Sequence, residues 1–130
     1  MAKSRGEDPR LKRLSGICLA LPESVRERRS SHAAFRVRSK IFAYYLDDHH
    51  GDGMVAVCCR TARGENVQWV AARGSTFYLP AYIGPRGWVG IRLDVGPIDW
   101  REVADFVQES YRLVAPKRLA AQVGGGRNTP

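Results

Sequence analysis

The sequence predicts an α+β protein in which helices cover a mainly antiparallel, five-stranded sheet, forming a two-layer sandwich. Segments with helical periodicity stand near the beginning, the middle and the end of the chain. Three strand-like segments precede the middle helix and two follow it, which gives the order α-β(3)-α-β(2)-α. Helices and strands do not alternate singly, so a doubly wound parallel sheet is disfavoured. The 130 residues, 44% of them hydrophobic, are enough for one domain with its own core.

The first helix is expected to begin at Asp8-Pro9, because aspartate caps helices and proline suits the first helical position. Apolar side chains then recur at spacings of three and four residues and form one helix face: Leu11, Leu14, Cys18 and Leu21. Pro22 ends this helix. Residues 23–31 are polar and basic, and the pattern leaves their structure open.

Residues 33–46 are rich in β-branched and aromatic side chains and allow two interpretations. In one long strand, alternation would place Arg36, Arg38 and Lys40 on the same face. Alternatively, a tight turn at Arg38-Ser39 divides the segment into a hairpin. Both interpretations bring the three cations together.

The middle of the chain predicts a turn, a helix and three further strands. The sequence DDHHGDG at residues 47–53 is typical of a turn. Strands are expected at 54–61, 75–79 and 88–94, and a helix at 65–73. The apolar face of that helix is assigned to Val67, Val70 and Ala71, and Gly74 ends it.

The last helix has the clearest pattern. Asp99 and Glu102 stand at the spacing of a capping box. An apolar stripe follows, made by Val103, Phe106, Val107 and Val114. Pro116 ends the helix. We expect a single domain over residues 8–121 with flexible tails at 1–7 and 124–130.

The charge is distributed unevenly. The formal net charge is +8, and residues 1–40 hold 11 Lys and Arg against four Asp and Glu. The remaining residues hold 10 basic and nine acidic side chains, so the excess lies almost entirely in the first third. This asymmetry suggests one basic surface able to bind nucleic acid. The alternative is a solvated face that keeps the protein soluble.

Several segments together resemble the MmcQ/YjbR family. They are ICLALPES (17–24), AFRVRSKIFAYYL (34–46), the strand at 54–61, FYLPAYIGPRGWVGIRLD (77–94) and DWREVADFVQESYRLVAPKRL (99–119). The most specific are GPRGWVGIRLD and YRLVAPKRL, and the resemblance covers roughly residues 8–121. It implies an α-β(3)-α-β(2)-α sandwich with the hairpin turn at Arg38-Ser39. Members are mostly described as predicted DNA-binding proteins with a double-wing arrangement of hairpins, which is an inference from fold.

Arg36, Arg38 and Lys40 are the first candidate nucleic-acid-binding residues. A two-stranded ribbon fits the major groove of DNA, and its cations neutralise phosphates. The alternative interpretation is that charge protects exposed strand edges against aggregation.

Arg86 and Trp88 are candidates in the loop YIGPRGW. The glycines on either side of Arg86 would let backbone N–H groups and the guanidinium approach an anion, and Trp88 or Tyr82 would stack on a base. The alternative is a connecting turn whose aromatic side chains pack on the sheet.

Lys117 and Arg118 are the last candidates. At the end of the final helix, they would complement the helix dipole. A phosphate contact would be an additional role.

No metal, cofactor or catalytic site is expected. Cys58 and Cys59 are adjacent on a strand, so their side chains are expected to point to opposite faces. The two thiols therefore cannot easily bind the same metal ion, whether or not His32, His49 or His50 contributes to the site. We find no nucleophile elbow, P-loop or GxGxxG motif. Three cysteines do not form a disulfide framework, which together with the lack of a signal peptide or a long apolar run predicts a cytoplasmic protein.

The sequence thus favours a module that binds double-stranded DNA through a basic hairpin. One alternative is a protein-interaction module or homodimer that uses an uncovered sheet face. Another is a small enzyme or a binder of an anionic metabolite that uses Arg86.

Overall fold

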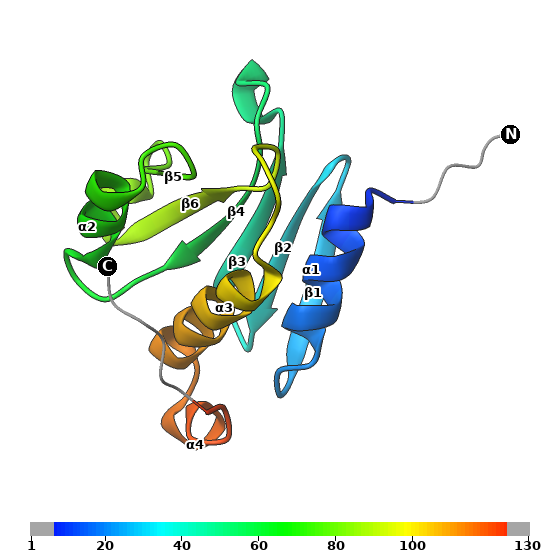
Figure 1. The fold of residues 1–130 in the computed structure, drawn as a ribbon. Helices are drawn as coiled ribbons and strands as arrows, with labels where there is room; N and C mark the ends of the chain where they lie inside the picture. Colours follow the sequence, from blue (N-terminus) through cyan, green and yellow to red (C-terminus); the bar gives the residue numbers. More distant parts are fainter. Residues whose placement is uncertain (1–6, 125–130) are drawn as a thin grey trace, which may run out of the picture.

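An antiparallel sheet of six strands, in the order β1-β2-β3-β4-β6-β5, forms the centre of the computed structural model (Figure 1). The structure describes residues 7–124. The tails predicted to be flexible therefore lie outside the described residues, except for Glu7 and Gly124.

The helices and strands confirm the α+β class. The strands are β1 (Ser24–Arg29), β2 (His32–Val37), β3 (Lys40–Asp47), β4 (Val55–Arg60), β5 (Phe77–Tyr78) and β6 (Trp88–Arg92). The helices are α1 (Pro9–Leu19), α2 (Glu65–Ala72), α3 (Trp100–Val114) and α4 (Lys117–Ala120), with single 3-10 turns η1 (His49–Gly51) and η2 (Gly84–Arg86). None of these helices has the length and apolar composition needed to cross a membrane.

The sheet has one strand more than the five predicted. Strand β1 occupies the segment whose structure the sequence left open, and it pairs with β2 along its whole length, from Ser24 opposite Val37 to Arg29 opposite His32. Its sequence, SVRERR, has one large apolar side chain and so lacks the hydrophobic alternation that identifies a strand. Charged side chains of this kind are common on edge strands, where they oppose aggregation.

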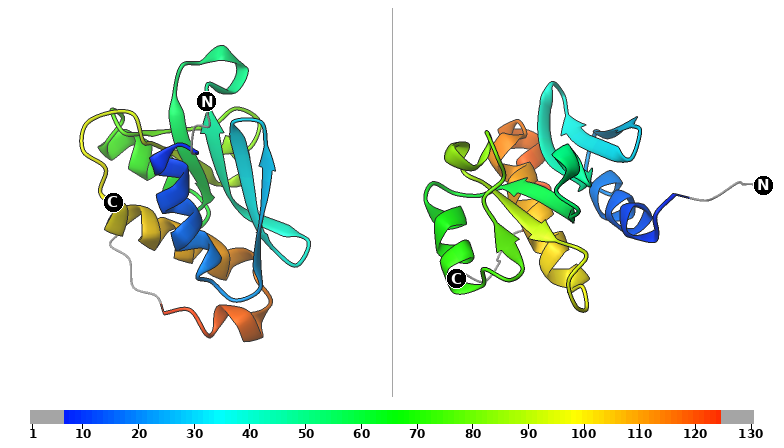
Figure 2. Two further views of the ribbon diagram at one scale, coloured as in Figure 1. Left: turned by 90° about the vertical axis from the view of Figure 1, so that its right-hand side faces the viewer. Right: turned by 90° about the horizontal axis from the view of Figure 1, so that it is seen from above.

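The α-helices lie on one side of the sheet, as Figure 2 shows, and leave the opposite face without a helix. The core lies between α1, α3 and the sheet. Phe35 and Val37 of β2 are fully buried there, and Phe42 of β3 meets Tyr111 of α3 edge to face, with ring centroids 5.3 Å apart. We call the uncovered side the helix-free face.

The two long helices begin where the sequence predicts. The Asp8 carboxylate accepts a hydrogen bond from the Arg10 N–H at 2.8 Å, and the Asp99 carboxylate accepts one from the Glu102 N–H at 3.1 Å. The predicted apolar positions Leu11, Leu14, Cys18 and Leu21 of the first segment are buried. Both capping predictions are confirmed.

Helix α2 buries a different face from the one predicted. Val67 is 55% exposed, whereas Asn66 and Trp69 are buried. The Trp69 ring stacks on Phe77 at 5.1 Å between centroids and meets Phe106 edge to face at the same distance. Of the three predicted residues, Val70 is partly buried and packs against the core, whereas Val67 and Ala71 are exposed. A large aromatic residue and a buried amide therefore contribute most to orienting this short helix.

The hairpin interpretation of residues 33–46 is confirmed. Strands β2 and β3 are joined by the turn at Arg38-Ser39. Arg38 takes the left-handed conformation, with φ of 57°, and Ser39 does not. The positive φ that such a turn requires therefore falls on the arginine, so serine is tolerated at the second position.

A buried hydroxyl joins β3 and β4 where their ladder ends. Ser110 of α3 donates a hydrogen bond to the Phe42 carbonyl at 2.6 Å and accepts one from the Arg60 N–H at 2.9 Å. The last residue pair of this ladder is Ala43 with Cys59, so the hydroxyl takes the place of the next strand-to-strand hydrogen bond.

We expect Ser110→Ala to lower the free energy of unfolding by about 1–3 kcal/mol, because the partly buried Arg60 N–H and the buried Phe42 carbonyl both lose this partner. Urea unfolding followed by tryptophan fluorescence measures this. Ser75→Ala, which removes an exposed hydroxyl, is the control. Equal stability of the two variants would contradict the bridging role of Ser110.

Candidate nucleic-acid interface

The cations of the N-terminal third do not form one basic surface. Five of the arginines within residues 1–40 form ion pairs with four carboxylates: Arg10 with Asp8, Arg26 and Arg28 with Glu7, Arg36 with Glu27, and Arg38 with Glu23. The expected single footprint is therefore wrong for the described residues. The sequence shows the excess of basic residues, but it does not show which carboxylates fold against them.

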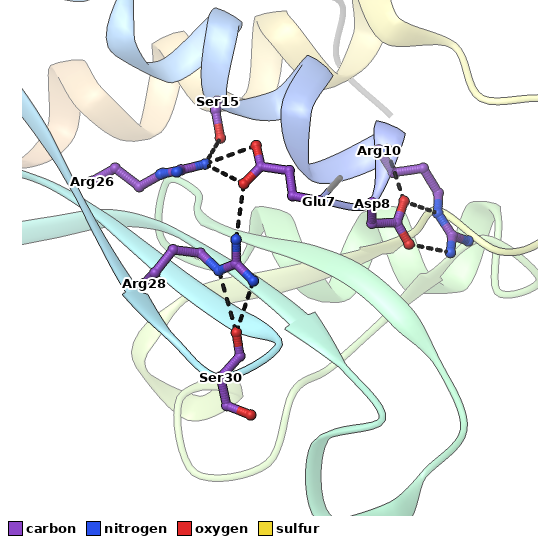
Figure 3. Close-up of polar contacts among 7 residues, drawn as sticks. All are labelled: Glu7, Asp8, Arg10, Ser15, Arg26, Arg28 and Ser30. Atoms are coloured by element: carbon purple, nitrogen blue, oxygen red, sulfur yellow. Dashed lines mark hydrogen bonds and ion pairs between the residues drawn. The ribbon is translucent and has the colours of Figure 1, made fainter. Parts of the chain in front are cut away.

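Glu7 holds two of these arginines between β1 and α1 (Figure 3). Arg26 Nη1 lies 3.0 Å from both carboxylate oxygens and 2.9 Å from the Ser15 hydroxyl. Arg28 Nη1 lies 2.9 Å from the same carboxylate, and its guanidinium also donates to the Ser30 carbonyl. Both arginines therefore lie on the helix side of β1 and serve to attach the strand to the first helix.

The predicted hairpin residues Arg36 and Arg38 are paired as well. Arg36 lies 2.7 Å from Glu27 of the neighbouring strand on the helix-free face. Arg38 donates to both oxygens of Glu23, at 2.6 and 3.3 Å, and this contact lowers the pKa of the Glu23 carboxyl. Exposed pairs of this kind contribute little to stability, but each cancels a positive charge that would otherwise face a phosphate.

The hairpin itself is not a free ribbon. Strand β1 pairs with the outer edge of β2, and β4 pairs with the outer edge of β3. Because both outer edges of the hairpin are paired, β2 and β3 are interior strands of the sheet rather than the free two-stranded ribbon that the sequence predicts for the major groove. The unpredicted strand β1 is the physical reason.

Six other cations gather at one end of the sheet, and we call them the basic end. They are Lys40, Arg60, Arg63, Arg86, Lys117 and Arg118. In the antiparallel sheet, the start of β3, the end of β4 and the start of β6 lie at the same end. All six side chains are exposed, and none forms an ion pair with a residue between positions 7 and 124.

The short helix α4 brings Lys117 and Arg118 to this end, below the β2–β3 turn in Figure 1. Helix α3 ends at Val114, so the two cations belong to a separate single turn rather than to the carboxyl end of α3. The helix-dipole explanation therefore does not apply to them. The charge of Arg118 also lowers the pKa of Glu23, which places α4 near the turn.

Among the described residues, the opposite end of the same strands holds three aspartates against one unpaired cation, Arg29 of the β1–β2 turn. Asp47 ends β3, and Asp48 and Asp52 flank η1 between β3 and β4. The unpaired cations outside the basic end are spread over other places: Lys12 and Arg13 on α1, Arg29 at the β1–β2 turn and Arg101 at the start of α3. The sheet is thus electrically polarised along its strands.

Three arginines of the basic end line one hollow of about 510 Å³. Arg60, Arg63 and Arg86 contribute its cations, and no aspartate or glutamate lines it. Val67, Leu79 and Pro85 form an apolar part of the wall. We call this site the three-arginine hollow.

Buried polar contacts hold the walls of the hollow together. The Asn66 side-chain amide donates to the Gly84 carbonyl at 2.9 Å and to the Trp88 carbonyl at 3.0 Å. Thr61 donates through both its N–H and its hydroxyl to the Gly87 carbonyl, each at 2.8 Å. Gly87 has φ of 97°, and a Cβ there would lie 3.3 Å from the Thr61 carbonyl oxygen, so glycine fits this close contact best.

The loop around Arg86 differs from the predicted anion site. The N–H groups of Arg86 and Gly87 donate to the Ile83 and Gly84 carbonyls at 3.0 Å, so they are not directed to a ligand. Only the exposed guanidinium of Arg86 is available. The loop thus offers a side-chain cation and no backbone cradle.

Trp88 is placed inside the structure. It is 8% exposed, and its ring packs on Tyr44 at 5.4 Å between centroids on the helix-free face. It therefore does not offer its face to a base, in contrast to Tyr82, which is 85% exposed. On the same face, the Tyr78 ring covers Gly90, where a Cβ would lie 2.3 Å from a ring carbon.

Cys18, Cys58 and Cys59 are buried, and none of them forms a disulfide. Burial raises the pKa of the Cys58 thiol to about 12, so the thiol stays protonated and unreactive at neutral pH. No group of three or more His, Cys, Asp or Glu side chains able to hold a metal ion occurs among residues 7–124.

The YjbR family model matches residues 19–113, nearly three quarters of the sequence. The chain belongs to the YjbR family. The crystal structure of protein DR2400 of Deinococcus radiodurans, with domain DUF419, has the same fold with a TM-score of 0.67. The two are 18% identical, and the match covers 89% of this chain and 88% of that one. No curated protein matches the sequence.

Two arginines of this YjbR chain, Arg60 and Arg63, were missed by sequence reasoning. They flank the end of β4 and the start of α2, and the segment RTAR lacks the density of charge that draws attention to residues 1–40. Their positions in the sequence could have indicated them. Arg60 stands at the end of a strand, and Arg63 stands just before Gly64, the N-cap of the next helix.

Asn66→Ala should lower the free energy of unfolding of this YjbR protein by about 1–3 kcal/mol, because two carbonyls lose their buried donor. Chemical unfolding followed by circular dichroism measures the difference. Gln68→Ala removes an exposed amide from the same helix and serves as the control. If both variants unfold at the same urea concentration, the amide does not hold the loop.

Proposed function

We propose that this YjbR protein binds double-stranded DNA through the basic end, with its cations on the phosphate backbone. One observation carries the proposal: six exposed cations without a carboxylate partner among the described residues lie at one end of the sheet. An unpaired cation attracts a phosphate without first losing an internal partner. The paired arginines Arg36 and Arg38 are outside the proposed footprint, and Trp88 packs below the surface.

Contacts of this kind are independent of base sequence. Each neutralised phosphate releases condensed counterions, so log K falls with log salt with a slope of about −0.9 per contact. The six cations would together give a slope of about −5. The aspartates at the far end are repelled by the same polyanion, so the field favours one orientation.

This function needs no cofactor, metal ion or catalytic group, and we propose it for a protein that is not an enzyme. We place it in the cytoplasm, where reducing conditions keep thiols free. The three buried cysteines, which form no disulfide, are consistent with that compartment.

Replacing Arg60, Arg63 and Arg86 together by alanine should weaken binding of a labelled duplex and make the salt slope shallower by about 3. Fluorescence anisotropy over a series of salt concentrations measures both quantities. The wild-type protein should bind at low salt and lose affinity steeply as salt rises.

The matched control is a variant with Lys12, Arg29 and Arg101 replaced by alanine, which loses the same number of positive charges. Its salt slope should stay close to that of the wild type, because these three exposed cations lie on α1, at the β1–β2 turn and at the start of α3, away from the basic end. A slope that drops only in this control would place the interface outside the basic end. Absence of wild-type binding at low salt would reject DNA binding altogether.

A further inference from the structure

The three-arginine hollow has two kinds of wall. One is cationic, from Arg60, Arg63 and Arg86. The other is apolar, and it includes Val67 and Leu79, which are 55% and 46% exposed. These are two of the few large apolar side chains that the described chain leaves exposed. A ligand that satisfies both walls carries an anionic group beside a flat or apolar one.

The charge of the hollow selects among anions. Each guanidinium has five N–H donors and no acceptor, and no lining carboxylate offsets the three positive charges. A phosphate monoester carries a charge of about −1.5 to −2 at pH 7 and has three acceptor oxygens. An internal phosphodiester carries one negative charge and has two free oxygens, so it satisfies fewer of these donors.

The shape of the hollow points to the same group. Its walls come from Leu79 and from the segments 60–67 and 84–87, and Asn66 and Thr61 hold these two segments together. An internal phosphate of a duplex continues into the strand on both sides, whereas a terminal phosphate ends the strand and enters a recess. The adjoining Val67 and Leu79 would then contact the attached sugar and base.

We infer that the three-arginine hollow binds the terminal phosphate of a nucleotide, either a free mononucleotide or the phosphorylated end of a DNA strand. The inference rests on the proposed function, because both require these arginines to contact phosphate. It goes further by assigning to the hollow a preference for the monoester over the internal diester.

Isothermal titration with three adenine probes tests the preference. Adenosine monophosphate should bind about tenfold more tightly than cyclic adenosine monophosphate, the effect expected for the loss of one charge-assisted hydrogen bond. Adenosine, which has no phosphate, should not bind measurably. Equal affinity for the monoester and the cyclic diester would overturn the inference.

A second arm separates the two sources of the phosphate. Duplexes with phosphorylated or hydroxyl 5′ ends, and a covalently closed circle, compete for the protein in the anisotropy assay. Preference for the phosphorylated duplex supports strand-end binding. Duplex binding without that preference, together with equal binding of the two adenine nucleotides, overturns the inference and leaves the proposed function intact. Monoester binding without any duplex binding supports a free nucleotide and rejects the proposed function.

Variants connect the effect to the hollow. Arg63→Ala and Val67→Ser should each weaken binding of adenosine monophosphate, since they remove a cation and an apolar contact from its walls. Arg101→Ala removes an exposed cation from the start of α3 and should leave binding unchanged. Equal weakening by Arg63→Ala and Arg101→Ala, with no effect of Val67→Ser, would show that the nucleotide responds to net charge alone and would overturn the inference.

Discussion

The side-chain amide of Asn66 is the contact on which the arrangement of the basic end most depends. It is buried, and it ties the first turn of α2 to the carbonyls of Gly84 and Trp88 on the loop that carries Arg86. The end of β4 is held in the same way. The Thr61 hydroxyl donates to the Gly87 carbonyl, and the Ser110 hydroxyl donates to the Phe42 carbonyl and accepts from the Arg60 N–H. Buried polar groups of this kind are costly unless satisfied, so they specify one arrangement of the loops they join.

In this protein, the net charge of a segment does not show how many of its cations lack a carboxylate partner in the folded structure. The first forty residues hold most of the excess of basic side chains, yet five of their arginines are bound to carboxylates. The rest of the chain is nearly balanced in composition but supplies five of the six cations of the basic end. Folding therefore moves the surface able to meet a polyanion away from the segment in which basic residues are densest.

Local signals in the sequence were enough for the elements that begin with a cap or a turn. Asp8 and Asp99 locate the long helices, and the turn at Arg38-Ser39 locates the hairpin, because each effect acts within a few residues. Strand β1 could not be predicted in this way, since its pairing with β2 rests on backbone hydrogen bonds and on a distant partner, Glu7. The convergence of Arg60 and Arg86 is likewise a product of strand order, which places β6 beside β4.

Polarity along the strands limits how a polyanion can approach this fold. An anionic surface is attracted to the end with Arg60 and Lys40 and repelled from the end with Asp47 and Asp52. The helix-free face lies between these ends, and its aromatic side chains, Tyr44 and Trp88, are packed against each other rather than aimed outward. Contact with an anionic surface through the basic end would therefore use the unpaired charge, whereas contact through the helix-free face would meet aromatic side chains that are already packed.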